Sequence, residues 1–299
     1  MSQRHFALLE SRGLIRIGGE DATHFLQNLV TCDIEKVGAA HAGFGALLTP
    51  QGKILFDFFV LRTDDGYLLD TPRETLADFA KRLTFYRLRA KVEIEALGSD
   101  LGVAASWGDA SPSPLPGHHA SDPRLAELGE RHLGNLEDIR AALLEEGGQQ
   151  ETPEAYASHR IALSVPESLS DYSYSELFPH DADMDQLNGV SFSKGCYVGQ
   201  EVVSRVQHRA TARKRMIAVS ADTVLPEVGT EIQADGKAIG TLGSSAQANG
   251  AHVGIALVRL DKAQAARDKG AAFQCGDVAV ALNLPSWAGF TWPADPSDA

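Results

Sequence analysis

The residues best suited to chemistry lie in one octapeptide, Lys194-Gly195-Cys196-Tyr197-Val198-Gly199-Gln200-Glu201. A lysine ammonium close to a cysteine favours the thiolate, which is the reactive form of that side chain. The two glycines permit a positive φ or a close approach of the backbone to a ligand. The octapeptide therefore predicts a functional loop. The alternative is a glycine-bounded turn with a buried cysteine, followed by a strand-like run over residues 201–206.

A second candidate is Asp57, which lies in the apolar run Leu55-Phe56-Asp57-Phe58-Phe59. If its side chain faces the protein interior, the carboxylate is partly desolvated and suited to holding or moving a proton. The alternative is that Asp57 points to solvent on an alternating strand.

Basic residues form two runs in a chain whose net charge is −13. Residues 81–91 and 205–215 each hold five Lys or Arg residues and no acid. Such a run is either a solvated face or an anion site, because Arg and Lys clusters pair with carboxylate or phosphate. In the first run, Arg89 follows Tyr86 and has the planar guanidinium that suits a bidentate carboxylate contact. The overall charge opposes non-specific binding to nucleic acid.

The octapeptide resembles the signature Lys-Gly-Cys-(Phe or Tyr)-x-Gly-Gln-Glu of the YgfZ family. This family comprises folate-binding relatives of the glycine-cleavage T protein and is linked to iron–sulfur protein maturation and tRNA modification. Four further segments are similar to shared segments of these proteins, namely residues 25–34, 48–57, 86–94 and 177–185. The resemblance covers nearly the whole chain and is weakest over residues 108–133.

The resemblance implies a site for tetrahydrofolate or a one-carbon derivative. It implies Asp57 beside the pteridine, Arg89 at the glutamate end of folate, and Tyr86, Lys194, Tyr197 and Glu201 as further ligand-binding residues. Cys196 and Asp57 are then the catalytic candidates, and no metal site is implied. Gly52-Lys53 stands where a T protein typically has two glycines, and T proteins lack the Lys-Gly-Cys motif.

By this resemblance the chain is a folate-dependent accessory protein of iron–sulfur cluster assembly or repair, supporting iron–sulfur enzymes that include tRNA-modifying ones. Its expected partners are folate, iron–sulfur proteins or assembly factors, and tRNA, and a monomer is expected. One alternative is an aminomethyltransferase-type enzyme of one-carbon transfer. Another is a tRNA-binding scaffold, which the basic runs favour and the net charge opposes.

Strand and helix patterns mix without strict alternation, which indicates an α+β fold. We expect a T-protein-like folate-binding region over residues 1–209, made of two interleaved subdomains at 1–45 plus 135–209 and at 46–134. Short strands between glycine-rich turns predict a small β-barrel over 210–290, followed by a tail at 291–299. The prolines and serines of 108–123 predict a loop, and 164–193 reads as irregular.

Three cysteines in 299 residues argue against a disulfide framework, and none are close enough for a zinc or cluster site. No apolar run approaches the ~20 residues that a membrane span requires. The first ten residues lack a targeting pattern, so the sequence predicts a cytoplasmic location.

Overall fold

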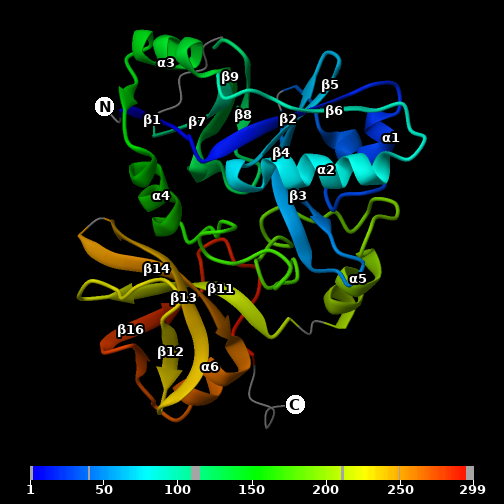
Figure 1. Cartoon of the computed structure of the whole chain (residues 1–299). Coiled ribbons are helices and arrows are strands. Elements are labelled where there is room, and N and C mark those ends of the chain that lie inside the picture. Colours follow the sequence, from blue (N-terminus) through cyan, green and yellow to red (C-terminus); the bar gives the residue numbers. More distant parts are fainter. Residues whose placement is uncertain (1–2, 40, 109–114, 210–211, 249, 294–299) are drawn as a thin grey trace. The chain divides into compact units, whose positions relative to one another are not determined.

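The computed structural model describes residues 3–39, 41–108, 115–209, 212–248 and 250–293 (Figure 1). The chain divides into two compact units. The first contains Met1–Tyr156 and Leu187–Gln200, and the second contains Ala157–Gln186 and Glu201–Ala299. The octapeptide therefore spans the boundary, with Glu201 in the second unit.

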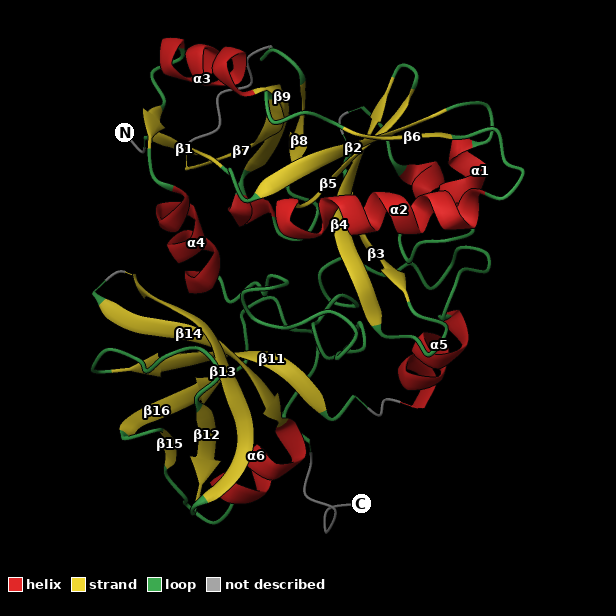
Figure 2. Ribbon diagram, viewed as in Figure 1, coloured by secondary structure: helices red, strands yellow, loops and turns green. Residues whose placement is uncertain are grey.

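One sheet of the first unit carries Asp57. It is antiparallel, and its strands lie in the order β3 (Gly43–Leu48), β4 (Ile54–Thr63), β5 (Gly66–Pro72), β2 (Arg12–Gly18) and β6 (Glu93–Ala96). The turn at 50–53 joins β3 to β4 in a hairpin. Figure 2 shows helix α2 (Leu76–Arg87) lying across this sheet.

The two faces of β4 have different surroundings. Phe79 of α2 stacks on Phe56 at 4.9 Å and contacts Phe58 at 5.4 Å between ring centroids. Because side chains alternate along a strand, Asp57 and Phe59 face the opposite side of the sheet from α2. The sheet thus separates Asp57 from the helix that ends near Tyr86 and Arg89.

The second sheet of this unit contains the N-terminal strand. Its order is β10 (Gln149–Gln150), β1 (Arg4–Leu8), β7 (Leu101–Gly108), β9 (Glu130–Asn135) and β8 (His118–Ser121). Helix α3 (Leu136–Glu145) is capped by the Asn135 side chain, which accepts hydrogen bonds from two backbone N–H groups. The chain crosses between the sheets after residue 8 and again after residue 96. The bounds expected for the two subdomains, 1–45 plus 135–209 and 46–134, stay predictions.

A buried ionic network lies on the Asp57 side of the first sheet. Asp70, fully buried, accepts hydrogen bonds from Arg12 Nε at 2.6 Å and Arg131 Nε at 2.8 Å. Arg124 pairs with Asp122 at 2.9 Å. Burial alone would raise the pKa of the Asp122 carboxyl, but the Arg124 guanidinium holds that pKa below its usual value. Charge pairing therefore replaces the lost hydration at this site.

The ring of Phe59 packs among the cations of this network. The guanidinium carbons of Arg131, Arg124 and Arg12 lie 3.9, 4.7 and 5.4 Å from its centroid. Guanidinium groups stack favourably on aromatic faces, so Phe59 joins the network to the sheet that carries Asp57.

Six strands of the second unit close into a barrel, which confirms the expected C-terminal β-barrel (Figure 2). Around the barrel they are β11 (Lys214–Ala221), β14 (Ala251–Arg259), β13 (Lys237–Ala248), β12 (Glu231–Ala234), β15 (Phe273–Cys275) and β16 (Val278–Asn283). Helix α6 (Leu260–Arg267) contributes Leu260 and Ala263 to the barrel core. The α+β fold class is also confirmed.

The remaining helices are short. They are α1 (Ala22–Gln27), α4 (Pro153–Ala162), α5 (Gln200–Arg209) and the 3₁₀ turns η1 (Ile34–Lys36), η2 (Arg73–Thr75) and η3 (Ala126–Leu128). No helix in the described part of the chain is long and apolar enough to cross a membrane.

Two local expectations are wrong. The strand-like run 201–206 is part of helix α5, because its valines at 203 and 206 are also spaced for one helical face. The expected loop 108–123 contains strand β8, which pairing with β9 recruits despite the unfavourable local composition. Residues 109–114 of that loop and 294–299 of the tail lie outside the described residues.

Candidate functional site

Lys194 anchors the octapeptide loop to the segment that follows helix α1. Its Nζ donates hydrogen bonds to the backbone oxygens of Val30 and Cys32, each at 2.7 Å, and the residue is 9% exposed. It also lies 5.4 Å from the ring centroid of Tyr197. Burial lowers the pKa of Lys194, although the neighbouring acidic groups oppose this. The ammonium therefore positions the loop, whereas the sequence predicted that it would activate the Cys196 thiol.

Thr31 links the segment just before this loop to the strand pair that carries Asp57. The Thr31 hydroxyl donates to the Gly189 oxygen at 2.6 Å, and the Thr31 N–H donates to the Ala46 oxygen at 3.0 Å. Ala46 in turn pairs with Asp57 across β3 and β4. Two strand spacings separate Thr31 from Asp57, which is roughly 10 Å. The fully buried Thr31 was missed from the sequence, because a lone threonine there carries no signal of its long-range partners.

Only one of the two glycines of the octapeptide is required by its surroundings. Gly199 has φ of +80°, and a Cβ there would lie 2.7 Å from the Thr49 oxygen and 3.0 Å from Gly52 Cα. A side chain at Gly195 would meet nothing within 4 Å. Gly199 thus lets the loop close onto the β3–β4 turn.

Cys196 is the exposed cysteine, whereas Cys32 and Cys275 are buried. Burial raises the pKa of the Cys32 thiol to about 12, against the lowering effect of the Lys194 ammonium. Burial also raises the pKa of Cys275. In the part of the chain that the structure describes, no three His, Cys, Asp or Glu side chains are grouped to hold a metal ion. Cys196 is therefore the thiol available to a partner.

We expect one cysteine of the native protein to react rapidly with Ellman's reagent at pH 8, and three to react after denaturation. Cys196→Ser should remove the rapid phase. Two rapidly reacting thiols in the native protein at pH 8 would contradict the burial of Cys32.

The burial of Cys32 also predicts how stability depends on pH. Since the pKa of Cys32 rises from 9.0 to about 12 on folding, the free energy of unfolding should fall as pH rises from 9 to 12.

Asp57 is buried, with 4% of its surface exposed. Its backbone oxygen accepts a hydrogen bond from the Thr71 hydroxyl at 3.2 Å, across to β5. The alternative of a solvent-facing carboxylate is thus wrong. A buried carboxylate is shielded from water. Asp57 is therefore suited to accept a hydrogen bond from a donor group of a bound molecule.

Tyr86 and Arg89 lie apart from Asp57. Tyr86 is half-buried in the last turn of α2, and Arg89 is exposed just beyond the helix. A ligand that touched Asp57 and Arg89 together would have to reach both faces of the sheet. Glu201 is exposed in the first turn of α5, where a carboxylate interacts favourably with the helix dipole.

Tyr197 carries a buried polar atom that lacks a partner. Its hydroxyl forms no hydrogen bond with any described residue, and burial raises its pKa to about 12. The phenol is therefore protonated and can donate. A buried, unsatisfied hydroxyl costs free energy unless a ligand or water completes it.

Several known proteins are similar to this chain. The family model of the CAF17 C-terminal beta-barrel domain matches residues 213–290. The human iron–sulfur cluster assembly factor IBA57, mitochondrial, is 31% identical over 95% of this chain and 84% of its own length. The mouse protein of that name is 30% identical over 84% of this chain and 76% of its own length. A homologue from Mycosarcoma maydis is 31% identical, and the chain spans 56% of its length.

A solved structure shares the fold. The glycine cleavage system aminomethyltransferase T from Bartonella henselae superposes with a TM-score of 0.76, covering 96% of this chain and 86% of that one. The two sequences are 14% identical, so the likeness confirms the expected T-protein-like fold and no more.

The expected cytoplasmic location is contradicted, because these curated relatives are described as mitochondrial. That expectation rested on the lack of a targeting pattern in the first ten residues. The lack of a pattern carries no physical information about the compartment.

Proposed function

Because this chain belongs to the family of IBA57 iron–sulfur cluster assembly factors, we propose that it is a folate-dependent accessory protein of iron–sulfur cluster assembly or repair. The observation that carries the proposal is the exposed Cys196, held on a loop that the buried Lys194 anchors. A thiol on an anchored loop meets a partner at a defined position with little further loss of entropy.

In this proposal Cys196 contacts a cluster ligand, a partner protein or a folate-bound carbon. Its partners are iron–sulfur proteins or other assembly factors, and the chain acts as a monomer. In this proposal the iron–sulfur enzymes that the chain supports include tRNA-modifying ones, as in the YgfZ family. Cys32 and Cys275 are buried, and burial raises the pKa of both thiols, so we leave them outside the mechanism.

Two residues fit a bound folate. The buried Asp57 carboxylate is the acceptor that the amino and ring N–H donors of a pteridine require. The unsatisfied Tyr197 hydroxyl offers a donor on the same unit. Folate would supply a one-carbon unit at this site. Tyr86 and Arg89 lie beyond the opposite face of the sheet, so we assign them no contact with the pteridine.

Cys196→Ser should leave the protein folded and abolish its support of iron–sulfur enzymes. The change exchanges one exposed atom, so the free energy of unfolding should change by no more than surface substitutions usually cause, roughly ±0.5 kcal/mol. The measurement is aconitase-type enzyme activity in cells that lack their own relative and carry either form of this chain. Ser204→Ala, on helix α5, is the matched control. Full activity with Cys196→Ser would remove the thiol from the proposal.

Calorimetric titration with tetrahydrofolate and with 5-formyl-tetrahydrofolate tests the cofactor. We expect micromolar binding to the wild type and a loss of about 2–4 kcal/mol, or roughly 30- to 1,000-fold, in Asp57→Asn, because the amide mispairs with a ring donor. Asp64→Asn, in the turn after β4, is the control with an unchanged fold. If neither folate binds, folate is not the cofactor, and only the assembly role of the proposal remains.

A further inference from the structure

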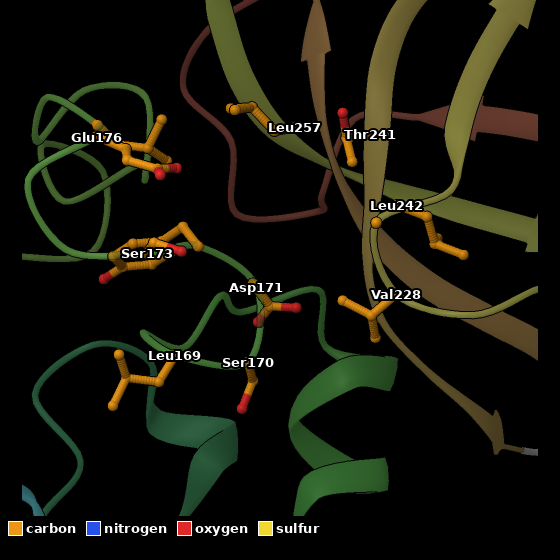
Figure 3. Close-up of a pocket in the computed structure, with 12 residues that line it drawn as sticks. Leu169, Ser170, Asp171, Ser173, Glu176, Val228, Thr241, Leu242 and Leu257 are labelled. Carbon is orange, nitrogen blue, oxygen red and sulfur yellow. The ribbon is translucent and has the colours of Figure 1, made fainter. Parts of the chain in front are cut away.

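A pocket of about 270 Å³ opens in the second unit, away from every residue assigned above. One wall is the irregular segment 169–177 and the other is formed by strands β13 and β14 with the turn at 228–229. Figure 3 shows Leu169, Ser170 and Glu176 on the first wall and Val228, Thr241 and Leu242 on the second. The volume is close to the small end of ligand pockets, so it suits one long side chain better than a cofactor.

Asp171 makes the pocket rigid. Its carboxylate accepts hydrogen bonds from the Ser244 N–H at 2.7 Å, the Glu167 N–H at 2.8 Å and Arg160 Nη1 at 2.9 Å. Arg160 is 2% exposed and also donates to the Val165 oxygen at 2.6 Å. These bonds tie the irregular wall to β13. The pocket is therefore preformed, which lowers the entropy lost on binding.

Aliphatic side chains stand exposed at the rim. Leu169 is 41% exposed and has φ of +65°, a conformation that is costly for a leucine. Val228 is 62% exposed. The backbone thus holds Leu169 outward opposite Val228, although burying either side chain would be favourable. An apolar rim of this kind marks a contact surface for another molecule.

The residues that line the pocket include Asp171 and Glu176 and no Lys or Arg. Glu176 is exposed on its wall and forms no hydrogen bond or ion pair with any described residue. Glu227 adjoins Val228, and segments 161–193 and 216–236 contain no Lys or Arg. The cation beneath, Arg160, is already paired with both Asp171 and Glu167. A free carboxylate therefore faces the opening without a compensating charge.

We propose that this pocket docks a segment of a partner protein by binding an arginine side chain flanked by aliphatic residues. The planar guanidinium matches the Glu176 carboxylate and leaves donors for the Ser170, Ser173 and Thr241 hydroxyls. The methylene stem of the arginine packs between Leu169 and Val228, and a neighbouring aliphatic residue covers the rim. The surface is independent of the folate and thiol proposals, so each can fail without the others.

The test uses two peptides, acetyl-Gly-Leu-Arg-Leu-Gly-amide and the same peptide with citrulline in place of arginine, which keeps the shape and removes the charge. Each is titrated into the ¹⁵N-labelled full chain. We expect the arginine peptide to shift the amide signals of Ser173, Gly229 and Thr241. Citrulline should weaken binding about fivefold, as expected for the loss of one exposed charge pair.

Glu176→Gln should weaken the arginine peptide to the same extent and leave the citrulline peptide unchanged, whereas Val228→Ser should weaken both. Glu145→Gln, an exposed carboxylate on α3, is the matched control. Equal binding of the two peptides, or no shifts at these amides, would overturn the proposal. So would a wild-type dimer that Glu176→Gln dissociates, because the occupant would then be a second copy of the chain.

Discussion

Replacing Arg131 by methionine is expected to lower the free energy of unfolding of the first unit by about 3–5 kcal/mol. Arg131 is 1% exposed and pairs with Asp70, which is fully buried. Methionine retains most of the apolar volume but leaves the Asp70 carboxylate paired with Arg12 alone among the guanidinium groups of Arg12 and Arg131. Removing one member of a buried ion pair leaves the desolvation cost of the other only partly compensated. The loss of the contact with Phe59 adds to this effect.

Native-state hydrogen exchange in β5 and β9 measures this effect, because those strands carry Asp70 and Arg131. Arg259→Met is the control. Arg259 pairs with Asp261 at 2.7 Å, but their side chains are 33% and 40% exposed, so the loss should stay below about 1 kcal/mol. Equal losses of unfolding free energy in the two variants would mean that the buried pair of Asp70 and Arg131 stabilises the fold no more than an exposed pair does.

Lys194→Met should detach the octapeptide loop from the segment after helix α1. The variant should no longer support iron–sulfur enzymes, although it still contains the Cys196 thiol. The backbone oxygens of Val30 and Cys32 lose their shared donor, and each unsatisfied buried acceptor costs about 1–3 kcal/mol. The Ser191 N–H, which donates to the Thr31 oxygen at 2.9 Å, should then exchange faster with solvent. The loss of function is measured by the same cellular assay as for Cys196→Ser.

Lys36→Met provides the matched control for this change, since Lys36 is 71% exposed and pairs with Asp33 three residues away. It should alter neither exchange nor function. If Lys194→Met kept wild-type exchange at Ser191 yet lost function, Lys194 would act directly on a ligand or on Cys196. If it kept both, the loop would hold its position without the lysine.

Local patterns in the sequence were sufficient for most of the elements. Helix α3 follows from local signals, because an apolar face, an Asn cap and a Gly-Gly end act within a few residues. The β3–β4 hairpin and the barrel strands follow from alternation and turn residues in the same way. Where two patterns fit one segment, as in 201–206, local reading chose the strand and the structure has a helix.

The sequence by itself determined which residues could do chemistry, the α+β class and the barrel. These depend on residue type and on short-range periodicity. Only the tertiary structure decided that Lys194 donates hydrogen bonds to backbone oxygens 162 and 164 positions away. It also decided that the sheet separates Asp57 from Tyr86 and Arg89. Contacts of this kind arise when distant segments pack, and no local pattern encodes which face or which partner a side chain will meet.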